Sequence, residues 1–157
     1  MTTESYTRLQ LAESQLESAI GLFITGQDKF SAITLAGAAD VILTRLVLNS
    51  GKKTFTDSLL EEHQKSGSSD ESRETYGKGI NDALYINQLK HMDDGEDGYL
   101  ELDPEECALG AILKALVNYL QIDGHQPDLF NAFKLWMTQN LDHNKYNVHC
   151  DPDWKIN

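Results

Sequence analysis

Residues 32–48, AITLAGAADVILTRLVL, are the most apolar stretch of the chain, and Asp40 and Arg45 are their only charged residues. A helix of this composition is apolar around nearly its whole circumference, so it needs neighbouring helices on most sides. The stretch is short for a bilayer, and two charges interrupt it. We therefore predict a buried central helix and no membrane association.

The flanking segments have the periodicity of helices that could cover this one. Apolar residues recur at intervals of three and four before it, which predicts a helix over residues 4–24. After it we expect a helix over residues 57–65 capped by Thr54 or Thr56, a helix that starts at Pro104 behind an Asp103 N-cap, and a last helix from Pro127.

This pattern predicts an all-α antiparallel bundle of five to six helices in a single domain, residues 1–141. Residues 66–72, SGSSDES, are expected to form a mobile loop within it. Residues 93–103 form an acidic loop, and residues 142–157 a polar tail.

Composition bounds the function. Against 13 Lys and Arg residues the chain has 25 Asp and Glu residues, so its net charge is -12. Nucleic acid is an unexpected partner on these grounds, because polyanion binding depends on basic side chains that displace counterions. Two cysteines do not make a disulfide framework, and the N-terminus lacks the pattern of a signal peptide, so we expect a cytoplasmic protein.

The stretch most suggestive of a site is residues 83–94, ALYINQLKHMDD. Ile80, Leu84, Asn87 and His91 follow one another at intervals of four, three and four, which predicts a helix over residues 83–92 with an amide and an imidazole on its packed face. Two interpretations follow. Asn87 and His91 are hydrogen-bonded at the edge of a core, or they belong to a site.

The order of these segments, with Asn-x-x-Lys-His at a helix end, resembles the HEPN superfamily of small all-α bundles over residues 9–94. In HEPN ribonucleases an Arg and a His with four to six residues between them, together with a polar residue just after the Arg, form a metal-independent RNA-cleaving site across a dimer. Asn87 and His91 match the polar residue and the His, whereas Ile86 stands in place of the Arg. The resemblance therefore implies the scaffold and a homodimer rather than the nuclease activity.

Three classes of function remain open. The first is a HEPN-like binding or regulatory module without strong catalysis, with Asp40, Asn87, Lys90 and His91 as candidate ligand-binding residues. In it Asp40 needs a partner, for which Arg45, Lys90 or His91 are the candidates. The second is a HEPN-type ribonuclease with His91 as its catalytic acid or base. The third is a protein-protein interaction domain whose site is unrelated to the Asn87–His91 motif.

The acidic loop has partial calcium-loop spacing. Asp93, Asp97 and Glu101 fall at positions one, five and nine of such a loop, but Gly95 and Pro104 occupy positions three and twelve, where carboxylates are needed. We therefore expect a structural loop without a metal, and the sequence predicts no cofactor. The metal-capable groups of the tail match no zinc spacing; they are His143, His149, Cys150 and Asp151.

Overall fold

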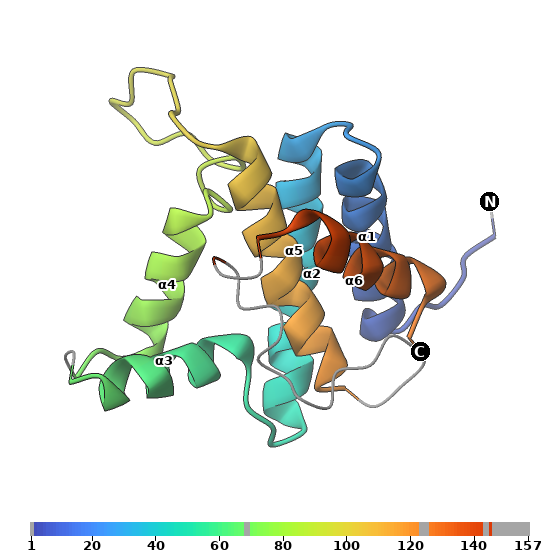
Figure 1. The fold of residues 1–157 in the computed structure, drawn as a ribbon, viewed down its shortest axis with the longest axis horizontal. Helices are drawn as coiled ribbons and strands as arrows, with labels where there is room; N and C mark the ends of the chain where they lie inside the picture. The colour runs from blue at the N-terminus through green and yellow to red at the C-terminus, as the bar shows by residue number, and fades with distance from the viewer. Residues whose placement is uncertain (1, 68–69, 123–125, 143–144, 146–157) are drawn as a thin grey trace.

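The computed structural model describes residues 2–67, 70–122, 126–142 and 145. The metal-capable side chains of the tail, His143, His149, Cys150 and Asp151, lie outside these ranges. Within this part the chain forms six α-helices and no strand, which confirms the all-α prediction (Figure 1). The helices are α1 (Arg8–Ile24), α2 (Lys29–Asn49), α3 (Phe55–Lys65), α4 (Arg73–Ala83), α5 (Pro104–Leu120) and α6 (Asp128–Asn140).

Helix α2 lies between α1 and α5, and the predicted central helix is confirmed. Leu43, near its middle, is fully buried. Although α2 is long and apolar enough to cross a membrane, α1 and α5 pack against it here as they would around the central helix of a bundle. On the other side of α1, the rings of Phe133 and Trp136 from α6 lie 5.9 and 5.0 Å from that of Phe23.

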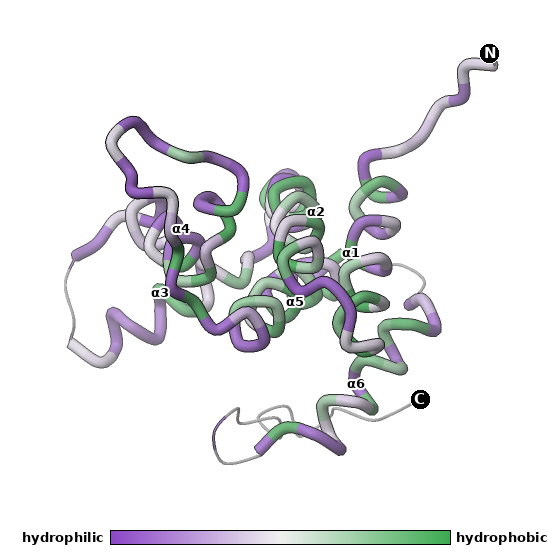
Figure 2. The backbone as a smooth tube through the Cα atoms, turned by 90° about the horizontal axis from the view of Figure 1, so that it is seen from above, coloured by the Kyte–Doolittle hydropathy of each residue, from purple (hydrophilic) through white to green (hydrophobic). Residues whose placement is uncertain are grey.

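The bundle is antiparallel between α1 and α2, but α5 runs parallel to α2 (Figure 1). Lys29, at the start of α2, lies 3.4 Å from Glu105 at the start of α5. Beyond the opposite ends, Lys52 Nζ donates to the Gln121 carbonyl at 2.8 Å. The chain returns to the first end through α3 and α4, which stand to one side of the other helices (Figures 1 and 2).

The predicted caps of α3 and α5 are confirmed. Thr54 Oγ1 accepts from the Asp57 N–H, and the Asp57 carboxylate accepts from the Thr54 N–H in return. Asp103 Oδ1 accepts from the Glu105 and Glu106 N–H groups at 3.0 and 3.1 Å, with Pro104 at the first helical position. These bonds satisfy donors that a helix leaves without internal partners at its start.

The helix predicted over residues 83–92 is wrong. Helix α4 begins behind Ser72 and ends at Ala83; residues 84–90 form turns in which Tyr85 has a φ of 56°. Ile86 packs into a notch at Gly37 of α2, where an added Cβ would lie 2.5 Å from its Cγ2. Leu84 packs in the same way against Gly110 of α5, where an added Cβ would lie 2.5 Å from Leu84 Cδ2. Residues two apart in sequence point to different faces of a helix, so only a non-helical chain inserts both.

Helices α3 and α4 form a hairpin that buries little. Thr56 is the only buried residue of α3 in the described structure, and α4 has none. Polar contacts hold the hairpin together: Arg73 Nε lies 2.5 Å from Asp57 Oδ1, and Arg73 Nη2 donates to Thr54 Oγ1 at 3.2 Å. At its base, the Phe55 N–H donates to Asn118 Oδ1 of α5 at 2.8 Å.

Candidate functional site

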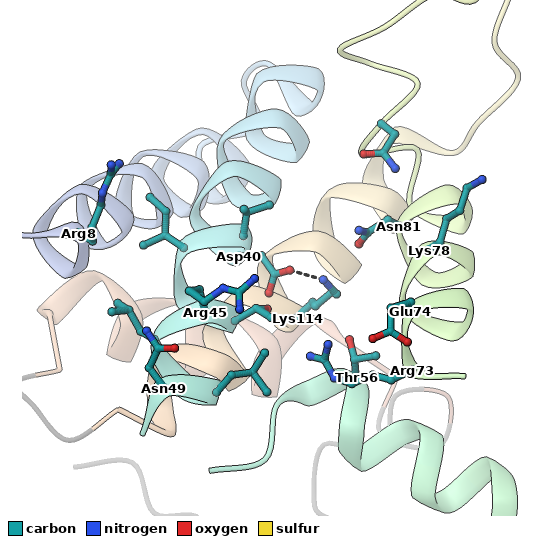
Figure 3. A pocket seen from close by; sticks show the side chains of 17 residues that line it. Arg8, Asp40, Arg45, Asn49, Thr56, Arg73, Glu74, Lys78, Asn81 and Lys114 are labelled. Carbon is teal, nitrogen blue, oxygen red and sulfur yellow. Dashed lines mark hydrogen bonds and ion pairs between the residues drawn. The ribbon is translucent and has the colours of Figure 1, made fainter. Parts of the chain in front are cut away.

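A groove of about 740 Å³ extends across the exposed face of α2, from Arg8 of α1 to the α3–α4 hairpin. Its walls come from α2 on one side and from residues of α4 on the other, with Thr56 of α3 at one end and Asn87 after α4. Figure 3 shows Glu74 and Asn81 on the side of α4 that faces α2, whereas Arg8 lies on α1, across α2 from the hairpin. The site thus depends on how the hairpin is held away from α2.

The floor of the groove contains a buried polar network. Lys114 Nζ of α5 is hydrogen-bonded to Asp40 Oδ2, and both residues are only 4% exposed. Asn118 Nδ2 donates to Asp40 Oδ1 at 2.7 Å and to Thr44 Oγ1 at 3.1 Å. The Asp40 carboxylate therefore has a charged and a neutral donor, which is what a buried carboxylate requires. The expectation that Arg45, Lys90 or His91 pairs with Asp40 is wrong, because α5 packs against this side of α2 and brings Lys114 to the carboxylate, whereas Lys90 and His91 are exposed outside the groove.

The charge of the groove is opposite to that of the chain. Five of the 13 Lys and Arg residues line it, against two of the 25 Asp and Glu residues. All three arginines of the sequence are among them. The cations are Arg8, Arg45, Arg73, Lys78 and Lys114, and the carboxylates are Asp40 and Glu74.

The lining cations differ in how far protein groups already satisfy them. Lys114 is paired with Asp40, and Arg73 is paired with Asp57 of the hairpin. The side chains of Arg8, Arg45 and Lys78 form no hydrogen bond or ion pair with any residue that the structure describes. Figure 3 shows Arg45 reaching from α2 toward the Asp40–Lys114 pair. Its guanidinium group is thus available to bind an anion at the centre of the groove.

Asp57 fixes Arg73 in the wall of the groove. Partial burial raises the pKa of the Asp57 carboxyl, but hydrogen bonds from Thr54 and Arg73, with the charge of Arg73, outweigh this and leave the pKa below its usual range. The carboxylate therefore stays ionised and keeps the guanidinium oriented at neutral pH. It also links the α3 cap to the start of α4.

The groove combines these charges with apolar surface. Val41, with 64% of its surface exposed, lies beside Ile42, Leu46 and Leu48 in the lining. Asn81 and Asn87 supply amides at the hairpin side. A guanidinium group binds planar anions through paired N–H donors, and the aliphatic surface favours a less polar part of the same ligand. The arrangement therefore suits an anion that carries an apolar group.

The structure brings only two of the four predicted binding residues together. Asp40 and Asn87 both line the groove, whereas Lys90 and His91 are exposed outside its lining. Ile86 is 3% exposed and is held against Gly37. Ile86, the residue expected to replace the HEPN arginine, therefore lies in the core, and His91 does not share a packed face with Asn87.

The carboxylates proposed for calcium do not form a metal cluster. Nowhere in the described ranges do three or more His, Cys, Asp or Glu side chains gather as a metal ion requires. Asp97 Oδ1 instead accepts from the Tyr99 N–H at 3.0 Å, and the Asp93 carbonyl accepts from the Glu96 N–H at 3.2 Å. These carboxyl and carbonyl groups shape the turns of the acidic loop.

No protein-family model, curated protein or solved structure matches this chain. The functional argument consequently depends on the geometry and charge of the groove.

Proposed function

We propose that this protein is a HEPN-like binding module whose groove holds an anionic ligand with an apolar part. The observation that carries the proposal is the excess of cations along one groove, five Lys and Arg residues against two carboxylates, in a chain of net charge -12. In a protein with this excess of carboxylates, a cation on the surface would be expected to pair with one of them. Arg8, Arg45 and Lys78 line the groove without such a partner among the described residues. Their convergence favours a ligand that binds several of them.

Binding, rather than catalysis, is supported by the chemistry of the lining. The residues that line the groove include no His or Cys, and the carboxylates present are Glu74 and the paired Asp40. Guanidinium groups and amides orient an anion without exchanging protons near neutral pH. The ligand is held on one side by α2 and on the other by the hairpin, so binding stabilises the position of α3 and α4.

Phenyl phosphate is a suitable probe, because it combines an anion with an apolar ring. In calorimetric titration it should bind more tightly than inorganic phosphate, and phenol should not bind detectably. Arg45→Ala should weaken phenyl phosphate binding by about 10- to 100-fold, the effect of losing a hydrogen bond to a charged group. Arg45 is the variant of choice because it has no hydrogen-bonding or charged partner among the residues that the structure describes.

Lys90→Ala provides the matched control, since Lys90 is exposed and lies outside the groove. Its affinity for phenyl phosphate should equal that of the unmodified protein. No binding of either phosphate, or equal losses in the two variants, would contradict the proposal.

A further inference from the structure

We propose that the groove holds the acidic loop, residues 93–103, of a second copy of this chain, so that two copies exchange loops about a two-fold axis. This rests on the proposed anion-binding function of the groove and names its occupant. The chemistry, exposure and shape of the loop each support it.

The charge of the acidic loop complements that of the groove. The loop has six carboxylates and no basic residue, whereas the groove has the reverse excess of charge. Complementary charges steer two surfaces together and fix their register. The overall charge of -12 on each copy opposes association, and a local region of opposite charge reduces that repulsion where the two copies meet.

The apolar residues of the loop also match the groove. Tyr99 is 83% exposed, more than any other large hydrophobic residue described, and Leu100 beside it is 42% exposed. The groove offers Val41 and the aliphatic side chains next to it. A tyrosine flanked by carboxylates is an anion with an apolar part, which is the ligand chemistry that the lining suits.

The loop is held in one shape before it meets a partner. Tyr85 Oη donates to the Glu101 carbonyl at 2.7 Å, and Asp97 Oδ1 accepts from the Tyr99 N–H at 3.0 Å. Gly95 and Gly98 have φ values of 91° and 81°, which favour glycine and make the turns. A preorganised loop loses less conformational entropy when it docks.

The loop makes no hydrogen bond or ion pair with the groove of its own chain among the described residues. It projects away from the bundle in Figure 1. A second copy supplies the same loop to the groove and offers its own groove in return. The contact is then made twice, as in any interface about a two-fold axis.

Sedimentation velocity of the full chain over a range of concentrations tests the exchange. The unmodified protein should form dimers, and Arg45→Glu or Tyr99→Ala should each weaken dimerisation at least about tenfold. Lys65→Glu makes the same change of charge at an exposed site outside the groove, and Tyr6→Ala removes another exposed tyrosine. Both controls should dimerise as the unmodified protein does.

Mixing the two defective variants separates loop exchange from misfolding. Arg45→Glu keeps an intact loop and Tyr99→Ala keeps an intact groove, so the mixed pair has one unmodified contact and one contact that carries both substitutions. Because either substitution alone disables a contact, the mixture, with its one unmodified contact, should associate more strongly than either variant alone. A protein that is monomeric at all concentrations, a dimer that neither substitution weakens, or a mixture without recovery would overturn the exchange.

Phenyl phosphate distinguishes this outcome from failure of the groove itself. A monomeric protein that binds phenyl phosphate through Arg45 would refute loop exchange and leave the anion site standing. A protein that neither dimerises nor binds phenyl phosphate would refute both. If loops are exchanged, saturating phenyl phosphate should also shift the dimer toward monomer, because loop and probe occupy the same groove.

Discussion

The α2–α5 pair and the α3–α4 hairpin divide the molecule into two regions of opposite character. Eight residues of α2 and ten of α5 are buried, against one of α3 and none of α4. The pair is stabilised by apolar packing, whereas the hairpin depends on polar contacts and on Leu84 and Ile86, which follow it into the core. Apolar packing therefore stabilises one region and polar contacts the other, and the groove lies where the two regions meet, with α2 contributing to both the core and the groove lining.

Removing one member of the buried ion pair should have the largest effect. Lys114→Ala leaves the Asp40 carboxylate buried with Asn118 as its remaining donor, and the free energy of unfolding should fall by about 3 to 5 kcal/mol. Arg73→Ala breaks a more exposed pair in the hairpin and should cost about 1 kcal/mol or less. Urea denaturation measures the free energy of unfolding of both variants. Equal losses in the two variants would contradict the assignment of the α2–α5 pair, rather than the hairpin, as the more stable region.

Truncating the central helix should rank next. Leu43 is fully buried, so Leu43→Ala should lower the free energy of unfolding by about 2 to 5 kcal/mol. Leu60→Ala in α3, where the side chain is half-buried, should cost less than about 2 kcal/mol. The two variants compare the same chemical change in the two regions by urea denaturation, and a larger loss at Leu60 would contradict the assignment of the core.

Two helical glycines should respond to alanine with opposite signs. At Gly37 the new Cβ meets the stiff, buried side chain of Ile86, so Gly37→Ala should lower the melting temperature, with a loss of about 1 to 2 kcal/mol. At Gly79 of α4 nothing lies within 4 Å, so Gly79→Ala should stabilise by about 0.5 to 1 kcal/mol through helix propensity. If the two substitutions shift the melting temperature in the same direction, Ile86 does not pack tightly against Gly37 of α2.

The smallest effect should be the acid sensitivity of the hairpin. The pKa of Asp57 is lower in the folded protein than its usual value, so the folded state binds fewer protons there. The resulting stabilisation is complete above the unfolded pKa of about 4 and is lost as the pH falls through the folded value. Asp57→Asn should therefore flatten the decline of unfolding free energy below about pH 4. An unchanged profile would show that the Asp57–Arg73 pair does not stabilise the hairpin.

Most helix boundaries could be predicted because the signals are local. Thr54 and Asp103 are capping residues at the positions where α3 and α5 begin, and the apolar residues 32–48 are expected at the centre of a bundle. The conformation of residues 84–90 could not be predicted from the sequence, because the spacing of their apolar residues suits a helix. Only the space left at Gly37 and Gly110 favours the non-helical turns. That space exists only once α2 and α5 lie side by side.

Only part of the candidate site could be predicted from the sequence. Asp40 was identified because a carboxylate in an apolar helix needs a partner, and Lys114 and Asn118 give the same signal four residues apart in the apolar run of α5. That signal could have identified the pair. The convergence of Arg45 and Arg73 could not be seen, since nothing local connects an exposed residue of α2 with the first residue of α4.

Whether the groove binds anions is tested most directly by the arginine side chains themselves. The chain has three arginines, so its ¹⁵N spectrum should contain three Nε–Hε signals, each assignable by Arg→Lys substitution. On addition of phenyl phosphate, the signals of Arg45 and Arg73 should shift together and saturate, while the backbone signals of Lys90 and His91 stay in place. Saturable shifts at Lys90 and His91 with none at the arginines would contradict the groove as the binding site.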